Sequence, residues 1–311
     1  MDDSGLRLPA RRRRLAQQSE GEDYLSGLPD SLLHHILSFL PTRDSVRSSL
    51  LARRWRRLWA SVPAIVFSSV DKSSANSVDR FVASRSCSCS ISHLRLFKIK
   101  LEDGGALVRD LLIYAKSHGA QDVTLRQFFF PSDHLPLFDI LFDWPSLVAL
   151  NMQLIYTDIW EFTLPNRIIF SNLKTLSLML GVAEISATSL ARLLSCCPVL
   201  EELTLKSFYP WNCSIEIAAP NLRRLTLHRS TDLRIICPKL GFLEITTRNR
   251  LKRLHLEAPS LTSIQMHCFF GWIKLSRRFC DVNEEAAASV GDIHLEEFPL
   301  AHLVCYELFL V

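Results

Sequence analysis

The side chains best suited to chemistry in this 311-residue chain are cysteines and histidines that occur in close pairs. Cys87-x-Cys89 and Cys196-Cys197 offer the thiolates that zinc prefers. A structural zinc site needs four ligands, and neither pair is followed by a second pair at zinc spacing. Cys197 also fits an apolar position of an expected helix. We therefore expect no metal site and no cofactor.

Other short motifs also lack the partners that their chemistry requires. His255-x-Glu257 and His294-x-Glu296 match the start of the zinc-deaminase pattern, but no Pro-Cys-x-x-Cys follows either one. Gly104-Gly105 has no phosphate-binding pattern around it, and the chain contains no Gly-x-Ser-x-Gly motif. His34-His35 fits solvent-facing or interface histidines better than metal ligands. We expect a protein that is not an enzyme.

The formal net charge of +4 is unevenly distributed along the chain. Residues 1–60 hold 11 Lys and Arg against 7 Asp and Glu, and the remaining 25 basic and 25 acidic residues cancel. A nucleic-acid groove along the later part of the chain is therefore unsupported. The basic run Arg11 to Arg14 fits either a nuclear-import or nucleic-acid patch or an ordinary solvated tail.

Cysteine usage and hydropathy bear on the compartment. The nine cysteines are odd in number and scattered, which argues against a disulfide framework. The first 22 residues lack the apolar run of a signal peptide, and no run reaches the roughly 18 apolar residues of a membrane span. We expect the cytoplasm or the nucleus, with no membrane partner.

Residues 28–59 form a short stretch rich in large apolar side chains at helical spacing. Pro29 suits the start of a first helix, Pro41 ends it, and Trp55 belongs to a third segment. Domains below about 40 residues usually need a partner, a metal or disulfides. The apolar surplus therefore packs either on another protein or on the rest of this chain.

This stretch closely resembles the F-box of plant F-box/leucine-rich-repeat proteins, through Leu28-Pro29-Asp30, residues 36–42, residues 44–47 and Arg53-Arg54-Trp55-Arg56. The resemblance implies docking on a Skp-type adaptor and, through it, on a cullin-based ubiquitin ligase. It assigns to that docking face or its support Leu28, Pro29, Ile36, Leu37, Leu40, Val46, Leu50 and Trp55. Ala52 departs from the family's usual Ser, and a lost N-cap costs roughly 0.5–2 kcal/mol.

From Ile91 onward an apolar-x-x-apolar-x-apolar unit recurs, and its alternating half predicts a strand with one buried side. Six clear copies start at residues 147, 173, 200, 222, 240 and 261. The series resembles leucine-rich repeats. We therefore expect an α/β fold, with a small three-helix F-box followed by a leucine-rich-repeat solenoid.

The spacing of the copies predicts a change within the array. The early intervals of 26 or 27 residues leave room for helices, one of which is indicated by Leu190, Leu193, Leu194 and Cys197. The later intervals of 18 to 22 residues are too short, and there Ile215-x-Ile217-x-x-Pro220 recurs in kind at residues 233–238 and 254–259. We expect helices behind the first half and short extended segments behind the second.

The variable positions of the repeat strands are expected to lie on one exposed face. Their charge changes sign along the array, which indicates either a partner surface or ordinary solvated strands. The residues assigned to target binding are Glu201, Glu202, Arg223, Arg224, Lys252 and Arg253.

The expected function is the substrate-recognition subunit of a Skp–cullin–F-box ligase, which binds an unknown target protein. The alternative is an interaction or scaffold protein whose F-box recruits no ligase. The expected organisation is a disordered basic tail, the F-box, a Ser-rich linker, the solenoid and an atypical C-terminal segment, over residues 1–22, 23–62, 63–90, 91–275 and 276–311.

Overall fold

The computed structural model describes residues 25, 27–70, 75–85, 89–130, 136–157, 162–181, 185–207, 214–228, 232–251, 253–270, 274–275 and 306–309. The internal contacts divide the chain into two compact units, Met1–Val62 and Pro63–Val311. The basic run 11–14 lies outside the described residues.

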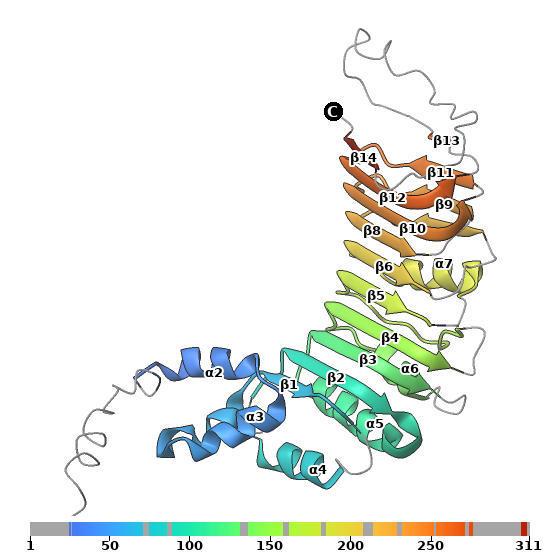
Figure 1. Ribbon diagram of the computed structural model, residues 1–311. Helices are drawn as coiled ribbons and strands as arrows, with labels where there is room; N and C mark the ends of the chain where they lie inside the picture. Colours follow the sequence, from blue (N-terminus) through green and yellow to red (C-terminus); the bar gives the residue numbers. More distant parts are fainter. Residues whose placement is uncertain are drawn as a thin grey trace, which may run out of the picture. The chain divides into compact units, whose positions relative to one another are not determined.

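The described part of the first unit contains two α-helices and three short 3₁₀ segments: α2 (Asp30–Ser38), α3 (Thr42–Arg47), Ser48–Leu50, Arg53–Arg56 and Leu58–Ser61 (Figure 1). Both helices follow a proline whose φ, −59° at Pro29 and −52° at Pro41, already suits a helix start. The core of the unit consists of Leu33, Leu37, Trp55, Leu58 and Val62.

The expected third helix of this unit is not a regular α-helix. The chain instead forms the two four-residue 3₁₀ segments after Ala52, which is extended (φ −156°, ψ 165°) and makes no side-chain cap. A methyl group cannot accept the N–H bonds that a Ser cap would accept. The guanidinium of Arg54 donates to Asp30 at the start of α2 (Nη2–Oδ1 2.5 Å, Nε–Oδ1 3.0 Å) and ties the segment down.

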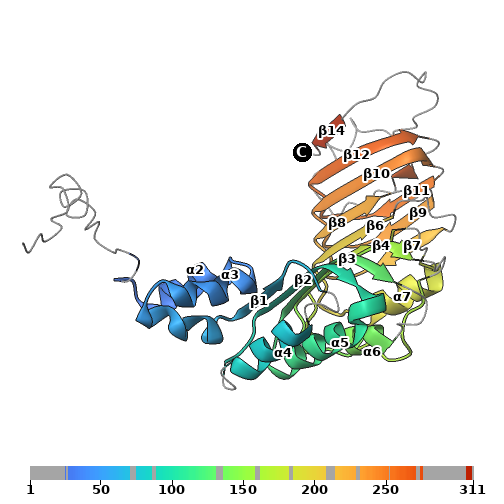
Figure 2. The same cartoon turned by 60° about the horizontal axis from the view of Figure 1, so that its bottom comes forward.

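The second unit is built on a ten-stranded sheet whose strands follow one another in chain order and are parallel up to the last pair (Figures 1 and 2). In order across the sheet they are β1 (Ala64–Phe67), β2 (His93–Lys100), β3 (Asp122–Phe130), β4 (Ala149–Thr157), β5 (Thr175–Met179), β6 (Glu202–Lys206), β8 (Arg224–His228), β10 (Phe242–Leu251), β12 (Ser263–Phe270) and β14 (Tyr306–Phe309). We call this the larger sheet.

One in-register row of buried apolar side chains runs across nine strands of the larger sheet. Each member pairs with the next in the strand register, and each side chain is at most 6% exposed. This row explains the recurring unit in the sequence, because each strand covers its inward face only with its neighbours. Its members are Ile65, Leu94, Val123, Leu150, Leu176, Leu203, Leu225, Leu243 and Ile264.

Helices accompany the first half of the larger sheet: α4 (Ala75–Ser84), α5 (Leu101–Ser117), α6 (Pro136–Phe142) and α7 (Ala187–Ser195). The predicted helix near residue 190 is confirmed as α7, with Ser186 as its N-cap and Leu190, Leu193 and Leu194 buried. The described residues 162–174 form no helix, so the helical backing is interrupted between β4 and β5. None of the helices in the described segments is both long and apolar enough to cross a membrane.

The second half of the unit is backed by a second sheet of parallel strands, which we call the smaller sheet. The three predicted Ile-x-Ile or Leu-x-Leu segments form three of its strands. Ile217, Leu233 and Ile235 are fully or almost fully buried. In order the strands are β13 (Lys274–Leu275), β11 (Arg253–Glu257), β9 (Asp232–Ile236) and β7 (Ile215–Ala218).

The interval 63–90, expected as a linker, contains folded elements of the second unit. Strand β1 pairs with β2, and helix α4 buries Val78 and Phe81. The Ser-rich composition indicated a partly ordered linker, but the few apolar side chains within it are enough to hold one strand and one short helix. In the C-terminal segment, β14 pairs antiparallel with β12, and residues 276–305 lie outside the described part.

Candidate binding surfaces

The first unit leaves many large apolar side chains in solvent. Seven of the nine exposed large apolar residues in the described chain lie between residues 25 and 51. Leu50 is 86% exposed, Phe39 72% and Leu51 70%. A monomer rarely gathers so much exposed apolar surface in so short a stretch without a use for it. We call this group the exposed apolar set: Leu25, Leu32, Ile36, Phe39, Leu40, Leu50 and Leu51.

Helix α2 divides its apolar residues between two stripes. Leu33 and Leu37, four residues apart, point into the core and are almost fully buried. Leu32 and Ile36 have the same spacing one residue earlier, and they are exposed. Phe39 continues the exposed stripe at the end of the helix, where its ring meets the His35 ring edge-on at 4.9 Å. The helix therefore presents one apolar stripe to its own unit and another to solvent.

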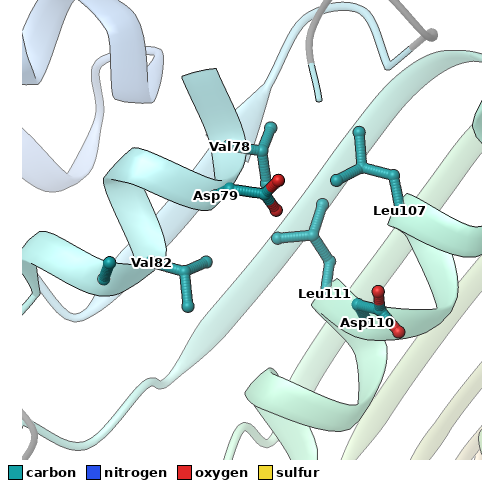
Figure 3. Close-up of a pocket in the computed structure, with 7 residues that line it drawn as sticks. Val78, Asp79, Val82, Leu107, Asp110 and Leu111 are labelled. Carbon is teal, nitrogen blue, oxygen red and sulfur yellow. The ribbon is translucent and has the colours of Figure 1, made fainter. Parts of the chain in front are cut away.

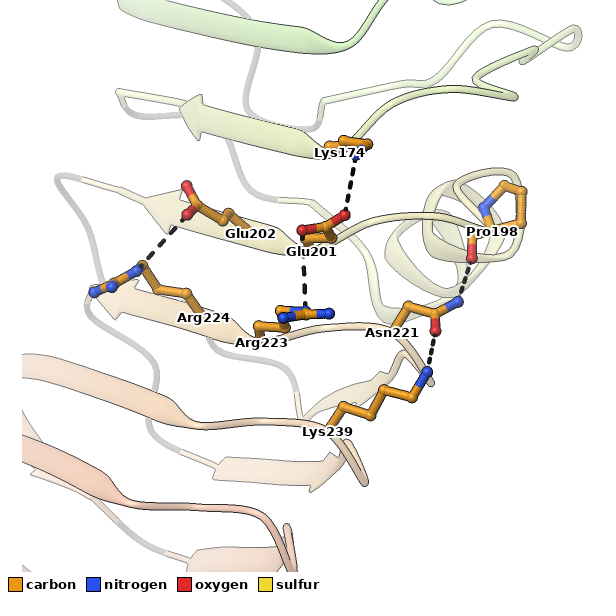
Figure 4. A network of polar contacts seen from close by, with 8 residues as sticks. All are labelled: Lys174, Pro198, Glu201, Glu202, Asn221, Arg223, Arg224 and Lys239. Carbon is orange, nitrogen blue, oxygen red and sulfur yellow. Dashed lines mark hydrogen bonds and ion pairs between the residues drawn. The ribbon is translucent and has the colours of Figure 1, made fainter.

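A second candidate surface lies on the outward face of the larger sheet, where charged residues at the starts of β5, β6 and β8 are paired (Figure 4). Glu201 lies between Lys174 (Nζ–Oε1 3.3 Å) and Arg223 (Nε–Oε2 4.0 Å). Glu202 faces Arg224 at 3.9 Å (Oε1–Nε). The acidic and basic pairs are 22 residues apart in sequence but lie on neighbouring strands, so they neutralise one another instead of forming separate zones.

Arg224 is held from two directions, and Glu244 accepts a hydrogen bond from a neighbouring strand. The Arg224 guanidinium lies over the Phe242 ring, with Cζ 4.6 Å from the ring centroid, while its Nε faces Glu202. Thr226 donates from Oγ1 to Glu244 Oε2 at 3.3 Å. Exposed ion pairs each contribute about 0–1 kcal/mol to stability, so this network adds little to the stability of the fold. Its main effect is to set the charge of this surface.

Two of the described cysteines, Cys197 and Cys237, are buried, whereas Cys196 is partly exposed. Burial, followed by the neighbouring Cys196, raises the pKa of Cys197 to about 12. Burial also raises the pKa of Cys237 to about 11. A buried thiol with a raised pKa supplies little of the reactive thiolate. Cys89 is partly exposed, and Cys87 lies outside the described residues.

The remaining candidate motifs are also dispersed. His255 and Glu257 contact each other on β11 (Nε2–Oε1 2.8 Å), and Gly104-Gly105 lies inside α5. His294-x-Glu296 falls outside the described residues. Within the described ranges, no group of three or more His, Cys, Asp or Glu side chains is placed to hold a metal ion.

A small pocket lies between α4 and α5 in the second unit (Figure 3). Its volume of about 200 Å³ is below the roughly 300–1,000 Å³ of typical small-molecule sites. Arg109 already faces the carboxylate of Asp110 at its rim (3.4 Å). We interpret the pocket as the seam between two packed helices, and its lining residues are Val78, Asp79, Val82, Ala83, Leu107, Asp110 and Leu111.

Comparison with known proteins supports the two-part organisation. The F-box domain family matches residues 25–66, and the family described as FBD-associated F-box protein At5g56370, LRR repeats, matches residues 108–236. The F-box protein At5g03100 of Arabidopsis thaliana is 30% identical over 259 residues, which cover 79% of this chain and 76% of that protein. The chain belongs to the plant F-box/leucine-rich-repeat family.

Other members of the family are longer. The F-box/LRR-repeat protein At5g02910 of Arabidopsis thaliana is 29% identical over 262 residues, covering 82% of this chain and 55% of the relative. F-box/LRR-repeat protein At3g03360 of the same plant is 30% identical over 264 residues, covering 79% and 48%. The chain thus spans about half the length of these two relatives.

The residues assigned to adaptor docking differ in their exposure. Leu28 and Val46 are half-buried, while Pro29, Ile36, Leu40 and Leu50 are exposed. Leu37 and Trp55 are core residues, so they are available to support a docking face but not to form its surface. The sequence assignment omitted Leu25, Leu32, Phe39 and Leu51. Their apolar character was visible, but spacing alone did not show which stripe of α2 faces outward.

The repeat assignments of this F-box/leucine-rich-repeat protein need one correction. Glu201, Glu202, Arg223 and Arg224 do lie together on the larger sheet. Arg253 instead belongs to β11 of the smaller sheet, where it is in register with Asp232. The short repeat interval puts residue 253 in the backing strand and not in the next repeat strand. Lys252 lies outside the described residues.

Proposed function

We propose that this protein is a substrate-recognition subunit of a Skp–cullin–F-box ubiquitin ligase. The observation that carries the proposal is the concentration of exposed apolar side chains in the F-box unit. Such a set gains free energy when a partner removes it from water, at roughly 25 cal/mol per Å² of apolar surface. The F-box then docks on a Skp-type adaptor, which connects it to a cullin.

The repeats hold a target protein in this proposal. We infer that the two sheets continue the solenoid arrangement of leucine-rich repeats and that the larger sheet offers the target-binding face. The protein itself carries out no bond chemistry; its contribution is to bring the target close to the ligase. No cofactor, nucleic acid or membrane takes part, and the complex works in the cytoplasm or the nucleus.

Adaptor binding gives the direct test. The wild-type chain and the double variant Phe39→Ala, Leu50→Ala are each co-expressed with a Skp-type adaptor. Their affinities for the adaptor are then compared. Both side chains are largely exposed, so the variant should fold, yet it should lose about 2 kcal/mol or more of binding free energy if these are central contacts.

Ile113→Ala is the matched control, because Ile113 is also an exposed aliphatic residue but lies on α5 of the other unit. It should bind the adaptor like the wild type. A second variant, Leu28→Ala with Pro29→Ala, tests the residues assigned by resemblance. Equal adaptor retention by all of these proteins would overturn the docking assignment.

A second candidate function is a scaffold whose F-box recruits no ligase. The uncapped Ala52 and the 3₁₀ segments after it favour this alternative, since they weaken the third segment of the F-box. The same experiment separates the two functions. A wild-type chain that is folded but binds no Skp-type adaptor would support the scaffold.

A further inference from the structure

The two sheets of the repeat unit differ in charge. Among the side chains that the structure describes, the strands of the smaller sheet contain one Lys or Arg residue against three Asp or Glu residues. Those of the larger sheet contain five Lys or Arg residues against three Asp or Glu residues. Since the repeat unit as a whole is close to neutral, the fold concentrates its basic excess on the larger sheet.

Ion pairs within the larger sheet do not use up its basic excess. One carboxylate, Glu201, is shared by Lys174 and Arg223, and the second pair is Glu202 with Arg224. Arg126 and Lys206 have no ion-pair partner among the described residues. The positive charge is therefore available on this face and is not used up within it.

Arg223 and Arg224 differ in how firmly they are held. Arg224 is fixed between Glu202 and the Phe242 ring. The Arg223 side chain is 72% exposed, and its ion pair with Glu201 spans 4.0 Å, the longest in the network. A guanidinium has five N–H donors in a planar fork that fits a carboxylate with two parallel bonds. Arg223 is thus loosely held and ready to accept a stronger anionic partner.

We propose that the larger sheet binds an acidic segment of a protein partner, with Arg223 as the anchoring cation and Arg224 as a fixed neighbour. This deepens, and rests on, the proposed role of the repeats in target binding. The partner segment must therefore carry negative charge.

The arrangement favours an acidic polypeptide over a nucleic acid. A duplex carries one negative charge per about 1.7 Å of its axis, so it meets every side chain along a groove. Here Glu201 and Glu202 interrupt the cations, and they would repel a continuous row of phosphates. Carboxylates in a protein segment are spaced singly and can meet Arg223 while avoiding Glu201.

The test uses the full chain and three fluorescent probes: a 12-residue Ser-Glu repeat peptide, the matching Ser-Lys peptide and a 12-base-pair DNA duplex. Anisotropy gives the affinities. We expect the Ser-Glu peptide to bind about tenfold more tightly than the Ser-Lys peptide, and the preference to weaken with added salt. Tighter binding of the DNA or of the Ser-Lys peptide, or no binding of any probe, would overturn the proposal.

Three variants assign the binding to the face. Arg223→Glu should weaken the Ser-Glu peptide about tenfold, and Glu201→Gln should strengthen it severalfold because it releases Lys174 and Arg223. Misfolding would weaken peptide binding, so the gain in affinity expected for Glu201→Gln cannot come from misfolding. The matched control is Arg234→Glu, which reverses an arginine paired with Glu216 on the smaller sheet and should leave affinity within about twofold.

An equal loss in Arg223→Glu and Arg234→Glu would show a general charge effect and contradict the assignment. Adaptor binding by the Arg223→Glu protein is measured in parallel. Retained adaptor binding with no peptide preference would reject this inference alone. Failure of the wild-type chain to bind the adaptor would reject the proposed ligase function instead.

Discussion

The F-box unit and the repeat unit differ in how many of their apolar side chains they leave exposed. In the F-box unit, side chains such as Phe39, Leu50 and Leu51 stay exposed, although the unit has a core around Leu33 and Leu37. In the repeat unit, the in-register row from Ile65 to Ile264 is buried, and Ile113 and Val199 are the exposed exceptions among the described residues.

Size and repetition explain the difference. A short helical unit has too much surface for its volume to cover all of its apolar side chains. A stack of repeats covers each inward face with the next repeat, whatever its total length. The exposed apolar side chains are therefore informative in the F-box unit, whereas in the repeat unit the informative feature is the charge left on the sheets.

The largest effect is expected from breaking the buried row of the repeat unit. Leu203→Ala removes a fully buried side chain from β6 and should cost about 2–5 kcal/mol of unfolding free energy, because a cavity remains. Urea unfolding measures it. Thr204→Ala, the adjacent outward position, is the control and should change stability by less than about 0.5 kcal/mol.

In the F-box unit, a buried and an exposed leucine should behave differently. Leu37→Ala opens a cavity in a small core that can partly collapse, so the expected cost is about 2–3 kcal/mol. Leu50→Ala should cost less than about 0.5 kcal/mol, because the side chain is already in water. Hydrogen–deuterium exchange of α2 measures both. A large loss of protection in Leu50→Ala would show that the exposed apolar set supports the unit itself.

The third prediction concerns the uncapped segment of the F-box. Ala52 already has the extended backbone of a cap position, so Ala52→Ser should stabilise the following segment by about 0.5–1 kcal/mol. Exchange protection of residues 53–61 would rise. Ala52→Val, which also lacks the hydroxyl and is as poor an N-cap as Ala, should give no such gain, and an equal gain would exclude capping as the cause.

A smaller effect is expected at the Asp30–Arg54 contact. Arg54→Gln removes an exposed ion pair and should destabilise the F-box unit by about 0.2–1 kcal/mol, at the low end because water screens both charges. The loss should shrink in high salt. Arg47→Gln, which removes an exposed pair within α3 at 3.4 Å, serves as the control, and an identical loss would mean that the link between segments has no special role.

The smallest effect at neutral pH is expected from the buried thiol of Cys237. Burial, opposed by backbone hydrogen bonds at Ala219 and Ile236, raises its pKa from 9.0 to about 11. The folded chain holds this proton more tightly than the unfolded chain, so the thiol's contribution to stability is constant below pH 9.0 and falls as the pH rises toward about 11.

Comparison with Cys237→Ala isolates this contribution. The variant should lose stability less steeply between pH 9.0 and about 11 than the wild type. Parallel stability–pH curves for the wild type and the variant would show that the thiol has the same pKa in the folded and unfolded chains, and would contradict the prediction. Alkylation of Cys237 in the folded protein at neutral pH should be slow for the same reason.

Much of the fold could be predicted from local patterns. The helix at Leu190 and Leu193 and the backing strands around Ile217 and Ile235 follow from spacing, because period and proline position depend only on nearby residues. The strand at 64–67 was missed, and the short helical face of Val78 and Phe81, which lies in α4, was assigned only to a partly ordered linker because the region is Ser-rich.

The candidate sites were predicted less completely. The sequence identified the apolar surplus of residues 28–59 and the charged positions 201, 202, 223 and 224. It did not show that Leu37 and Trp55 are buried while Leu32 and Phe39 are exposed, because neighbouring stripes of one helix look alike until their packing is known.

The sequence by itself determined that an F-box precedes a stack of repeats, since both are written in the order and spacing of apolar residues. Only the tertiary structure decided which charges meet. It paired Glu202 with Arg224 across neighbouring strands and moved Arg253 to another sheet. Contacts between residues far apart in the chain depend on strand order and register, and a local pattern contains neither.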